Sequence, residues 1–371
     1  MTENSLKAQF RTVFDRAPSW RVNAPSRINL IGEHIDYCGG RVLPMAIQGG
    51  TTVVSAENDS DMIRVYTERF SDRVSLKIRP DHSPGFYGDW RDYVAGVVSC
   101  LSRSESRVVG HDLYVTQSAG TAGLSTSASF CLALAKSLSP KSSEVELARI
   151  CQQVEHEFAR VQCGIMDQMS IALGGVIYLD CQALRWQVAS SDLDDVVVVV
   201  MDTGKARTLA GSAYNERVSE LHQVAQSFGA ENIDNLVSAP ATDFLPPHLA
   251  KRFRHVTTEH RRVAQAFEAI QSRDWSTLGR LMTASHESLR DDYEVSCREL
   301  DCMVELALKQ DGVLGARMTG GGFGGCAIAL AERLSVSQWM PVVAAAYQQQ
   351  TGIVPDLFEA EPAPGLSRQS C

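Results

Sequence analysis

The sequence predicts an α+β protein with two domains, and three observations lead to this prediction. The chain has 371 residues, whereas a single domain usually takes roughly 100–200 residues. Apolar and polar residues alternate at 63–66 and 74–78, as in half-buried strands, but apolar residues recur at helical spacing at 90–101. Strand-like and helix-like segments follow one another without the regular βαβ alternation of a doubly wound sheet.

The remaining elements follow in order. The expected strands lie at residues 26–30, 63–66, 74–78, 113–115 and 196–201, with one more inside 312–330. The expected helices lie at 90–101, at 128–137, after the capping box of Ser143 and Glu146, and over much of 210–309. The acidic segment 191–195 precedes a valine-rich strand, so we expect a domain boundary there, with domains at 1–192 and 193–371.

Charge and cysteine content exclude several classes of protein. The net charge is −9, without the basic excess of a nucleic-acid-binding protein. The short basic runs at 251–254 and 260–262 lie in helix-like sequence, and we expect them to be solvated helix faces. The ten cysteines form no CxxC pair, which is typical of a reducing compartment, and no apolar stretch is long enough to span a bilayer. We therefore expect a cytoplasmic protein that binds neither membrane nor nucleic acid.

Polar side chains cluster in the first motif, where a predicted strand ends. Residues 27–30 alternate, Gly32 permits a turn, and Glu33, His34 and Asp36 follow at once. Carboxylates accept hydrogen bonds from neutral hydroxyl groups, so this grouping suits a polyol such as a sugar. A charged surface turn would have the same composition.

A small-residue loop at 120–128 opens the predicted helix 128–137. Its glycines free the backbone, and the helix N-terminus that follows presents N–H groups and the positive end of the helix dipole. This arrangement predicts phosphate binding. A small-residue loop with a good N-cap is the alternative interpretation.

Glycine occupies five of the six positions 320–325. The spacing formally matches GxGxxG, but a dinucleotide fingerprint needs a preceding strand and a following helix. A strand-like segment, 326–330, follows instead, so we reject a Rossmann site. Five glycines still indicate a backbone that another group approaches closely.

Two further places supply carboxylates. Asp167 lies in the segment CGIMDQ at 163–168, where a lone Asp is usually a cap or turn residue. In the helix that begins after Ser143, Glu155 and Glu157 fall on opposite borders of the apolar stripe, and the helical pattern does not choose between them. No Walker A motif, protein-kinase motif or grouping of histidine and cysteine as metal ligands is present.

The four segments, in this order, resemble the GHMP kinase superfamily and, within it, the galactokinase family. The resemblance covers nearly the whole chain. It rests on SRINLIGEHIDYCGGRVLPMAI at 26–47, AGTAGLSTSA at 119–128, CGIMDQ at 163–168 and MTGGGFGGCA at 318–327, with DWRDYV at 89–94 and SAYNER at 212–217 as further likenesses.

The resemblance implies an ATP-dependent sugar kinase that converts galactose and MgATP into galactose 1-phosphate and ADP. It also implies a two-domain GHMP kinase fold. The N-terminal domain would contain a left-handed βαβ unit, as in ribosomal S5 domain 2, and the C-terminal domain would be ferredoxin-like. The implied cofactors are ATP and Mg²⁺, and the expected form is a monomer.

The resemblance further implies a role for individual residues. Asp167 would be the catalytic base at the anomeric hydroxyl, and Arg27 beside it would favour the ionised carboxylate. The family's Mg²⁺ carboxylate lies twelve residues before the base, which selects Glu155. The implied sugar contacts are Glu33, His34, Asp36, Gly164 and Tyr214; the implied ATP contacts are Trp90, Thr121, Ala122, Gly123, Leu124, Ser125, Thr126 and Ser127; the implied metal ligands are Ser127 and Glu155.

The chain departs from the family pattern at six positions. Ala119, Thr121 and Thr126 replace Pro, Gly and Ser near the phosphate loop, and Ser26, Ile35 and Cys38 replace Gly, Thr and Asn around the sugar motif. Two alternatives therefore stay open. One is a related sugar-1-kinase for arabinose, galacturonate or an amino sugar, for which Arg41 could face an acidic sugar or be solvated. The other is a non-catalytic regulator that binds sugar and ATP.

Overall fold

The computed structural model describes residues 3–104, 108–118, 123–190, 193, 195–206, 210–230, 233–238 and 244–371. The chain forms two compact units. The first combines Met1–Arg27, Ala46–Gly174 and Ala363–Cys371, and the second combines Ile28–Met45 and Gly175–Pro362. Each unit therefore joins segments that are far apart in sequence. The division into domains 1–192 and 193–371 stays a prediction.

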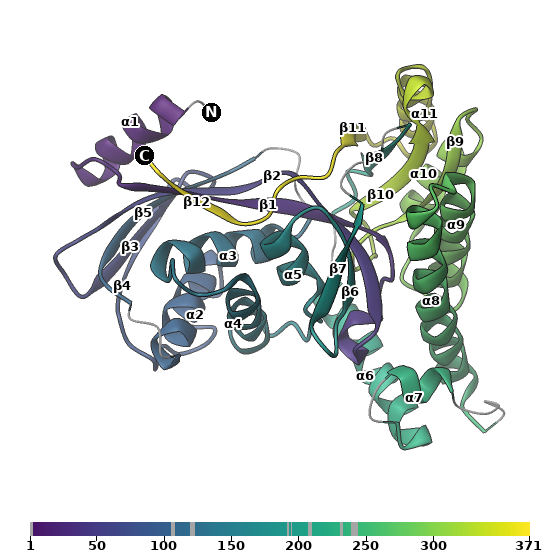
Figure 1. Cartoon of the computed structure of the whole chain (residues 1–371), viewed down its shortest axis with the longest axis horizontal. Helices are drawn as coiled ribbons and strands as arrows, with labels where there is room; N and C mark the ends of the chain where they lie inside the picture. Colours follow the sequence, from purple (N-terminus) through teal and green to yellow (C-terminus); the bar gives the residue numbers. More distant parts are fainter. Residues whose placement is uncertain are drawn as a thin grey trace. The chain divides into compact units, whose positions relative to one another are not determined.

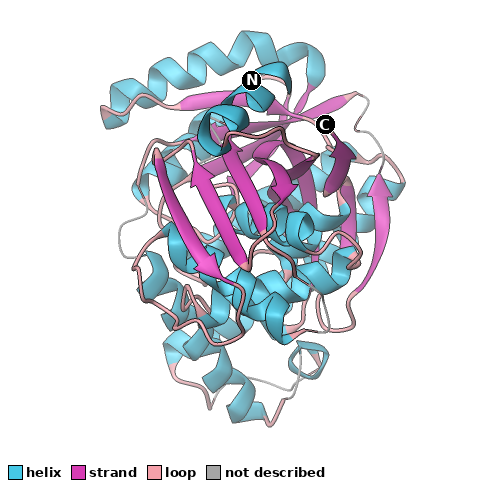
Figure 2. Ribbon diagram, turned by 90° about the vertical axis from the view of Figure 1, so that its left-hand side faces the viewer, coloured by secondary structure: helices cyan, strands magenta, loops and turns pink. Residues whose placement is uncertain are grey.

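A mixed sheet forms the centre of the first unit, and its strand order is β12-β1-β2-β5-β3-β4. β3 and β5 are parallel, whereas β1–β12, β2–β5 and β3–β4 are antiparallel pairs. Figure 2 shows these strands turned by 90° from the view of Figure 1. The strands are β1 (Trp20–Ile31), β2 (Arg41–Glu57), β3 (Met62–Thr67), β4 (Asp72–Lys77), β5 (His111–Gln117) and β12 (Ser367–Ser370).

Helices cover both faces of this sheet. α1 (Glu3–Phe14) lies on one face, and the other helices of the unit lie on the opposite face (Figure 1). These are α2 (Trp90–Arg103), α3 (Thr126–Leu138), α4 (Glu144–Glu157) and α5 (Met166–Leu173). The capping box is confirmed in part, because the Ser143 hydroxyl accepts the Glu146 N–H at 3.3 Å. The strands and helices predicted in this part of the chain are confirmed.

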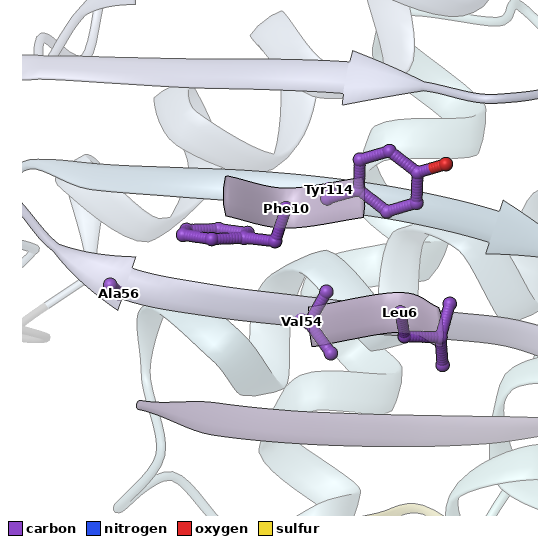
Figure 3. Close-up of a cluster of buried hydrophobic side chains, with 5 residues drawn as sticks. All are labelled: Leu6, Phe10, Val54, Ala56 and Tyr114. Carbon is purple, nitrogen blue, oxygen red and sulfur yellow. The ribbon is translucent and has the colours of Figure 1, made fainter. Parts of the chain in front are cut away.

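α1 is held by a small apolar cluster. Leu6 and Phe10 lie on one face of the helix at i, i+4 spacing and pack against Val54 of β2 and Tyr114 of β5 (Figure 3). Ala56 completes the buried set. Burying one Leu or Phe side chain contributes roughly 1.5–3 kcal/mol, so two such side chains anchor this short helix.

The second unit contains a four-stranded antiparallel sheet with the order β11-β8-β10-β9. Its strands are β8 (Val196–Asp202), β9 (Val313–Met318), β10 (Cys326–Glu332) and β11 (Asp356–Ala360). In chain order the elements run β-α-β-β-α-β, with helices between β8 and β9 and α11 (Val336–Thr351) between β10 and β11. Numbered within this sheet, the spatial order is 4-1-3-2, which is the ferredoxin-like arrangement. The family expectation for this part of the chain is confirmed.

The described part of the second unit also contains two further strands and, besides the short helix η2 (Arg333–Ser335), six more helices. β6 (Val176–Asp180) pairs with the first residues of β2, and β7 (Arg185–Ser190) pairs with β6. The helices are η1 (Asp36–Cys38), α6 (Ala210–Phe228), α7 (Ile233–Val237), α8 (Pro247–Gln271), α9 (Trp275–Asp291) and α10 (Arg298–Leu308). α9 and α10 pack against β9.

The expectation of solvated basic helix faces is wrong for part of α8. Arg252 is only 2% exposed, and it donates to Glu220 at 2.8 Å, Glu294 at 2.8 Å and the Asp292 carbonyl at 2.6 Å. His260 is also buried. The partners come from other elements, so the local sequence gave no sign of them. All ten cysteines are free, and within the described ranges no helix is long and apolar enough to cross a membrane.

Candidate active site

Arg27 and Asp167 form a two-pronged ion pair in the first unit. Arg27 Nε donates to Oδ1 of Asp167 at 2.6 Å, and its second terminal nitrogen donates to Oδ2 at 2.7 Å. Arg27 is 4% exposed, whereas the Asp167 side chain is 30% exposed. Asp167 lies in the first turn of α5, where the helix dipole favours a negative charge. The pair therefore presents an oriented carboxylate that a small molecule can reach.

A third donor reaches the same carboxylate from the phosphate loop (residues 121–127). The Ser125 hydroxyl donates to Oδ2 of Asp167. Ser125 is the N-cap residue of α3, but its side chain makes no capping hydrogen bond. Gly123 and Ser125 both have positive φ, at 84° and 59°. The N-terminus of α3 thus begins beside Asp167 without its own side-chain cap, as a phosphate-binding helix end requires. The predicted contacts Thr121 and Ala122 lie outside the described residues.

Glu155 of α4 is a buried carboxylate without a basic partner among the described residues. It is 5% exposed, bonds the hydroxyls of Ser127 and Tyr93, and lies near the like-charged Asp167. Burial raises the pKa of Glu155 to about 7, and Asp167 adds to the rise. Glu157 instead forms a surface ion pair with Arg103 at 2.6 Å. Of the two carboxylates that the helical pattern did not separate, Glu155 is therefore the one that is buried near Asp167, and its role as a metal ligand stays a prediction.

The residues around Glu155 are suited to a hard divalent cation. Among the described residues no group of three or more His, Cys, Asp or Glu side chains could hold a metal ion. Mg²⁺ does not need such a group, because it is commonly held by one or two carboxylates together with water and substrate phosphates. The Glu155 carboxylate and the Ser127 hydroxyl supply oxygen donors, and the missing basic partner of Glu155 leaves its charge to be balanced by a cation.

Two other predicted site residues of the first unit, Trp90 and Gly164, are packed against neighbouring elements. Trp90 begins α2, with its ring parallel to Phe70 at 6.1 Å and edge-on to Phe130 at 6.4 Å. Gly164 is buried just before α5. The carbonyl of the preceding Cys163 is bonded by His156 at 2.7 Å, which ties this segment to α4.

In the second unit, Glu33 of the sugar motif (residues 26–37) is buried within a hydrogen-bond network. Burial raises its pKa, and the guanidinium of Arg317 offsets part of the rise. Its donors are Asn29 Nδ2 at 2.8 Å, the Thr319 hydroxyl at 3.2 Å, the Gly320 N–H at 3.0 Å and the Arg317 guanidinium. A carboxylate has about four acceptor sites, so these groups occupy Glu33 and tie the sugar motif to the glycine motif (residues 320–325).

A second buried carboxylate, Glu259 of α8, fixes the turn that precedes Glu33. It accepts the Gly32 N–H at 2.9 Å, the Ser285 hydroxyl at 2.5 Å and Arg262 Nε at 2.7 Å. Gly32 has φ of 107°, which favours glycine. Burial acts to raise the pKa of Glu259, but the nearby cations Arg262 and Arg317 bring it down to about 2. Glu259 is therefore a charged anchor for the backbone of the sugar motif.

His34 is buried among aromatic rings. Tyr214 and Tyr293 lie at centroid distances of 5.4 and 4.9 Å from its ring. Its Nδ1 lies 3.1 Å from the Tyr37 hydroxyl, and its Nε2 lies 3.2 Å from the Gly321 carbonyl. Both ring nitrogens thus have partners within the protein. Asp36, the last predicted sugar contact of this motif, begins the short helix η1 and is partly exposed.

Two of the departures around this motif, Ile35 and Cys38, lie in the second unit and bond to each other. Ile35 is fully buried, and the Cys38 thiol donates to the Ile35 carbonyl at 3.1 Å. Burial raises the pKa of Cys38, so this thiol stays protonated. Arg41 pairs across the strands with Asp180, at 3.9 Å. The Arg41 side chain is 36% exposed, in accord with the solvated interpretation, and a contact with an acidic sugar stays a prediction.

Comparison with known proteins shows the family to which the chain belongs. A profile described as the galactokinase galactose-binding signature matches residues 8–57. Profiles for the N-terminal domain and the C-terminal region of GHMP kinases match 92–175 and 266–338. Galactokinases of Exiguobacterium sibiricum and Streptococcus thermophilus are each 37% identical to this chain. Each alignment covers 97% of this chain, and the two alignments cover 96% and 98% of the respective galactokinases.

The chain belongs to the galactokinase family. It is therefore an ATP-dependent sugar kinase. A crystal structure of Lactococcus lactis galactokinase complexed with galactose is 33% identical, with a TM-score of 0.89, and the match covers 98% of this chain and 99% of that one. A mevalonate kinase structure, 19% identical with a TM-score of 0.66, covers 92% of this chain and shares the fold. The predicted family and the two-domain GHMP kinase fold are confirmed.

Several residues that contact the predicted site residues within each unit were not predicted. Tyr37 directly follows Asp36 in the sugar motif, and Tyr93 lies in the segment DWRDYV at the start of α2. Their places inside these motifs were the signal that could have identified them. Glu259, His255 and Tyr293 lie in ordinary helical sequence or at a helix end, and no local pattern distinguishes them. Their positions become clear only from partners roughly 200 residues away in the chain, such as the Glu33 carbonyl that His255 bonds at 3.1 Å.

Proposed function

We propose that this protein transfers the γ-phosphoryl group of ATP to the anomeric hydroxyl of galactose, which gives galactose 1-phosphate and ADP. The observation that carries the proposal is the buried Arg27 that holds the half-exposed Asp167 by two hydrogen bonds, beside the N-terminus of α3. Membership of the galactokinase family and the likeness to a galactose-bound structure support the choice of sugar.

Asp167 is the catalytic base in this proposal. Arg27 fixes the plane of its carboxylate and favours the charged form. Among the described residues, Oδ1 accepts only the Arg27 Nε bond, so it keeps an acceptor site for the anomeric hydroxyl. Asp167 orients that hydroxyl and receives its proton as the oxygen attacks phosphorus. Phosphoryl transfer depends mainly on such positioning and on charge stabilisation.

The sugar contacts in this proposal are Glu33, His34, Asp36, Gly164 and Tyr214. Since the partners of Glu33 and His34 already occupy their polar atoms, these two residues shape the site, and any direct contact replaces an internal bond. Asp36 and Tyr214 offer oxygen atoms to the sugar hydroxyls. Two carboxylates and a phenol suit a neutral polyol better than a sugar acid, because an added carboxylate on the sugar would be repelled.

The nucleotide contacts in this proposal are Trp90, beside the adenine ring, and residues 121–127, along the phosphates. Ser127 and Glu155 would hold Mg²⁺, which supplies charge neutralisation between the β- and γ-phosphates when it is bound. The Ser125 hydroxyl is already bonded to Asp167. Ser125 therefore links the phosphate loop to the base, and its backbone N–H is the group that faces phosphate.

A coupled ADP-release assay with MgATP and a panel of free sugars tests the proposal. We expect the highest kcat/KM for galactose, and a product that no longer reduces alkaline copper because its anomeric carbon is blocked. A higher kcat/KM for arabinose, galacturonate or galactosamine would move the assignment to a related sugar-1-kinase. No turnover on any sugar, together with thermal stabilisation by a sugar, would identify a non-catalytic regulator.

A further inference from the structure

A line of hydrogen bonds in the second unit runs from the buried Tyr293 through the partly exposed Tyr37 and the buried His34 to the glycine motif. The Tyr293 and Tyr37 hydroxyls lie 2.6 Å apart, and the Tyr37 hydroxyl lies 3.1 Å from His34 Nδ1. The opposite ring nitrogen, Nε2, lies 3.2 Å from the Gly321 carbonyl. Three side chains and one carbonyl thus form a continuous chain.

The Gly321 carbonyl, at the end of this line of hydrogen bonds, determines which group donates in each bond. A backbone carbonyl can only accept, so His34 Nε2 must carry a hydrogen and donate to Gly321. Burial lowers the pKa of His34 to about 3, with the nearby His255 and Arg217 acting in the same direction, so the ring is neutral. A neutral ring with Nε2–H has a lone pair at Nδ1, and the Tyr37 hydroxyl must donate to it. The Tyr37 oxygen then accepts from Tyr293.

Tyr293 is itself held rigidly at the start of this chain. It is fully buried, its ring packs on His255 at 4.5 Å, and its N–H donates to the Ser288 carbonyl at 2.9 Å. Two residues further on, the Val295 carbonyl accepts the N–H of Phe323 at 2.8 Å. The segment 293–295 therefore fixes the sugar motif through a side chain and the glycine motif through its backbone.

We propose that Tyr293 and Tyr37 are positioning residues, which set the tautomer and orientation of His34 and hold its ring against the Gly321 carbonyl. The Tyr293 ring packs on His34, but the Tyr293 hydroxyl, which Tyr293→Phe removes, acts only through Tyr37. The effect on sugar affinity rests on the function proposed above, whereas the tautomer of His34 does not.

Nitrogen-15 NMR of the sugar-free protein, labelled at histidine, tests the tautomer directly. The variants are Tyr37→Phe, Tyr293→Phe and the control Tyr347→Phe, with the His34 signals assigned by their loss in His34→Gln. Tyr347 suits the control because it is as buried as Tyr293 and its hydroxyl donates a hydrogen bond to the Thr203 carbonyl at 2.9 Å. We expect protonated Nε2 and bare Nδ1 for His34, a shifted Nδ1 signal in Tyr37→Phe, and no change in Tyr347→Phe. Protonated Nδ1, or an unmoved signal in Tyr37→Phe, would overturn the proposal.

Sugar kinetics provide the second readout, with whichever sugar is turned over. Loss of one buried hydrogen bond corresponds to up to about a tenfold change. We expect KM for the sugar to rise about tenfold in Tyr37→Phe and about threefold in Tyr293→Phe, with KM for ATP unchanged. The double variant should match Tyr37→Phe, because the two residues act in series.

The outcomes separate the two proposals. Multiplied effects in the double variant, or an effect of Tyr293→Phe no larger than that of Tyr347→Phe, would overturn the positioning role even in an active kinase. If the NMR signals show the expected His34 tautomer but the protein turns over no sugar, the proposed function is overturned. The positioning role of Tyr293 and Tyr37 then remains intact.

Discussion

Two buried glutamates, Glu155 of α4 and Glu259 of α8, have opposite electrostatic environments. Among the described residues, Glu155 bonds only hydroxyl groups and lies near another carboxylate, and burial raises its pKa to about 7. Glu259 is more deeply buried, yet its pKa falls to about 2, because Arg262 and Arg317 outweigh the effect of burial. Burial alone therefore does not determine what a carboxylate does; the cations around it decide.

The difference indicates that Glu259 stabilises the fold, whereas Glu155 is a candidate for binding. Glu259 already has its cation and backbone partners, so its charge is used to hold the Gly32 turn. Glu155 has no such partner among the described residues, so it stays ready for a proton or an external cation. Carboxylates such as Glu155, whose pKa is shifted and which have no basic partner, are concentrated at functional sites.

The largest effect is expected from Glu259→Gln. The substitution removes the carboxylate partner of the partly buried Arg262 and the second of two carboxylates near the buried Arg317, which keeps Glu33, and breaking a buried ion pair costs about 3–5 kcal/mol. Urea unfolding at neutral pH should show that loss in the free energy of unfolding. A change below about 1 kcal/mol would mean that the network around Glu259 does not support the fold.

Glu155→Gln should act in the opposite direction. In the folded protein Glu155 keeps its proton up to about pH 7, whereas the unfolded chain releases it near pH 4.5. The folded state therefore binds the extra proton between these values, and its stability falls as the pH rises through this window. Without Mg²⁺, the variant should be more stable than the parent by about 3 kcal/mol above pH 7, because 2.5 pKa units correspond to about that energy.

The same pair of proteins gives a direct control. Below pH 4.5 the difference in the free energy of unfolding between the parent and Glu155→Gln should vanish, because the glutamate is then neutral in both states. A difference that does not depend on pH would show that packing, and not charge, separates the two proteins.

Mg²⁺ should produce a smaller stabilisation that depends on Glu155. With ADP present and Mg²⁺ at tenfold its Kd, the gain is about 1.4 kcal/mol. Thermal unfolding should show this gain for the parent and lose it on addition of EDTA. Glu155→Gln should show none. An equal gain in that variant would exclude Glu155 as a ligand of the ion.

The smallest effect is expected from Glu157→Gln. Its pair with Arg103 is on the surface, and such pairs contribute at most about 1 kcal/mol after screening by solvent. Turnover should stay within about twofold of the parent, whereas Glu155→Gln should lose at least about a hundredfold, as for loss of a group that stabilises transition-state charge. Steady-state kinetics of the two variants would thus test which border of α4 faces the site.

The sequence predicted most elements, because alternation, helical spacing and the Ser143 cap are local signals. It predicted the Arg27–Asp167 pair, 140 residues apart, only through the family resemblance. Local reasoning left Glu155 and Glu157 undecided, since a helical stripe does not reveal that Arg103 of α2 draws Glu157 outwards. It also misjudged Arg252, whose partners come from α6 and the segment after α9.

Three of the residues that sequence reasoning missed share one physical property. Glu259, His255 and Tyr293 each act through backbone or side-chain groups of the sugar motif more than 200 residues away. Nothing in a single sequence specifies such long-range pairing. The phosphate-loop departures Ala119 and Thr121 lie outside the described residues, so their effect on nucleotide binding stays a prediction.

The most direct test of the account is to separate binding from turnover at Asp167. Asp167→Ala and the isosteric Asp167→Asn should bind galactose within about threefold of the parent by calorimetry, because the other sugar contacts remain. Their kcat should fall by about a hundredfold to ten-thousandfold, as for loss of a general base. Normal turnover in Asp167→Ala, or loss of galactose binding in the folded Asp167→Asn, would contradict the role assigned to this residue.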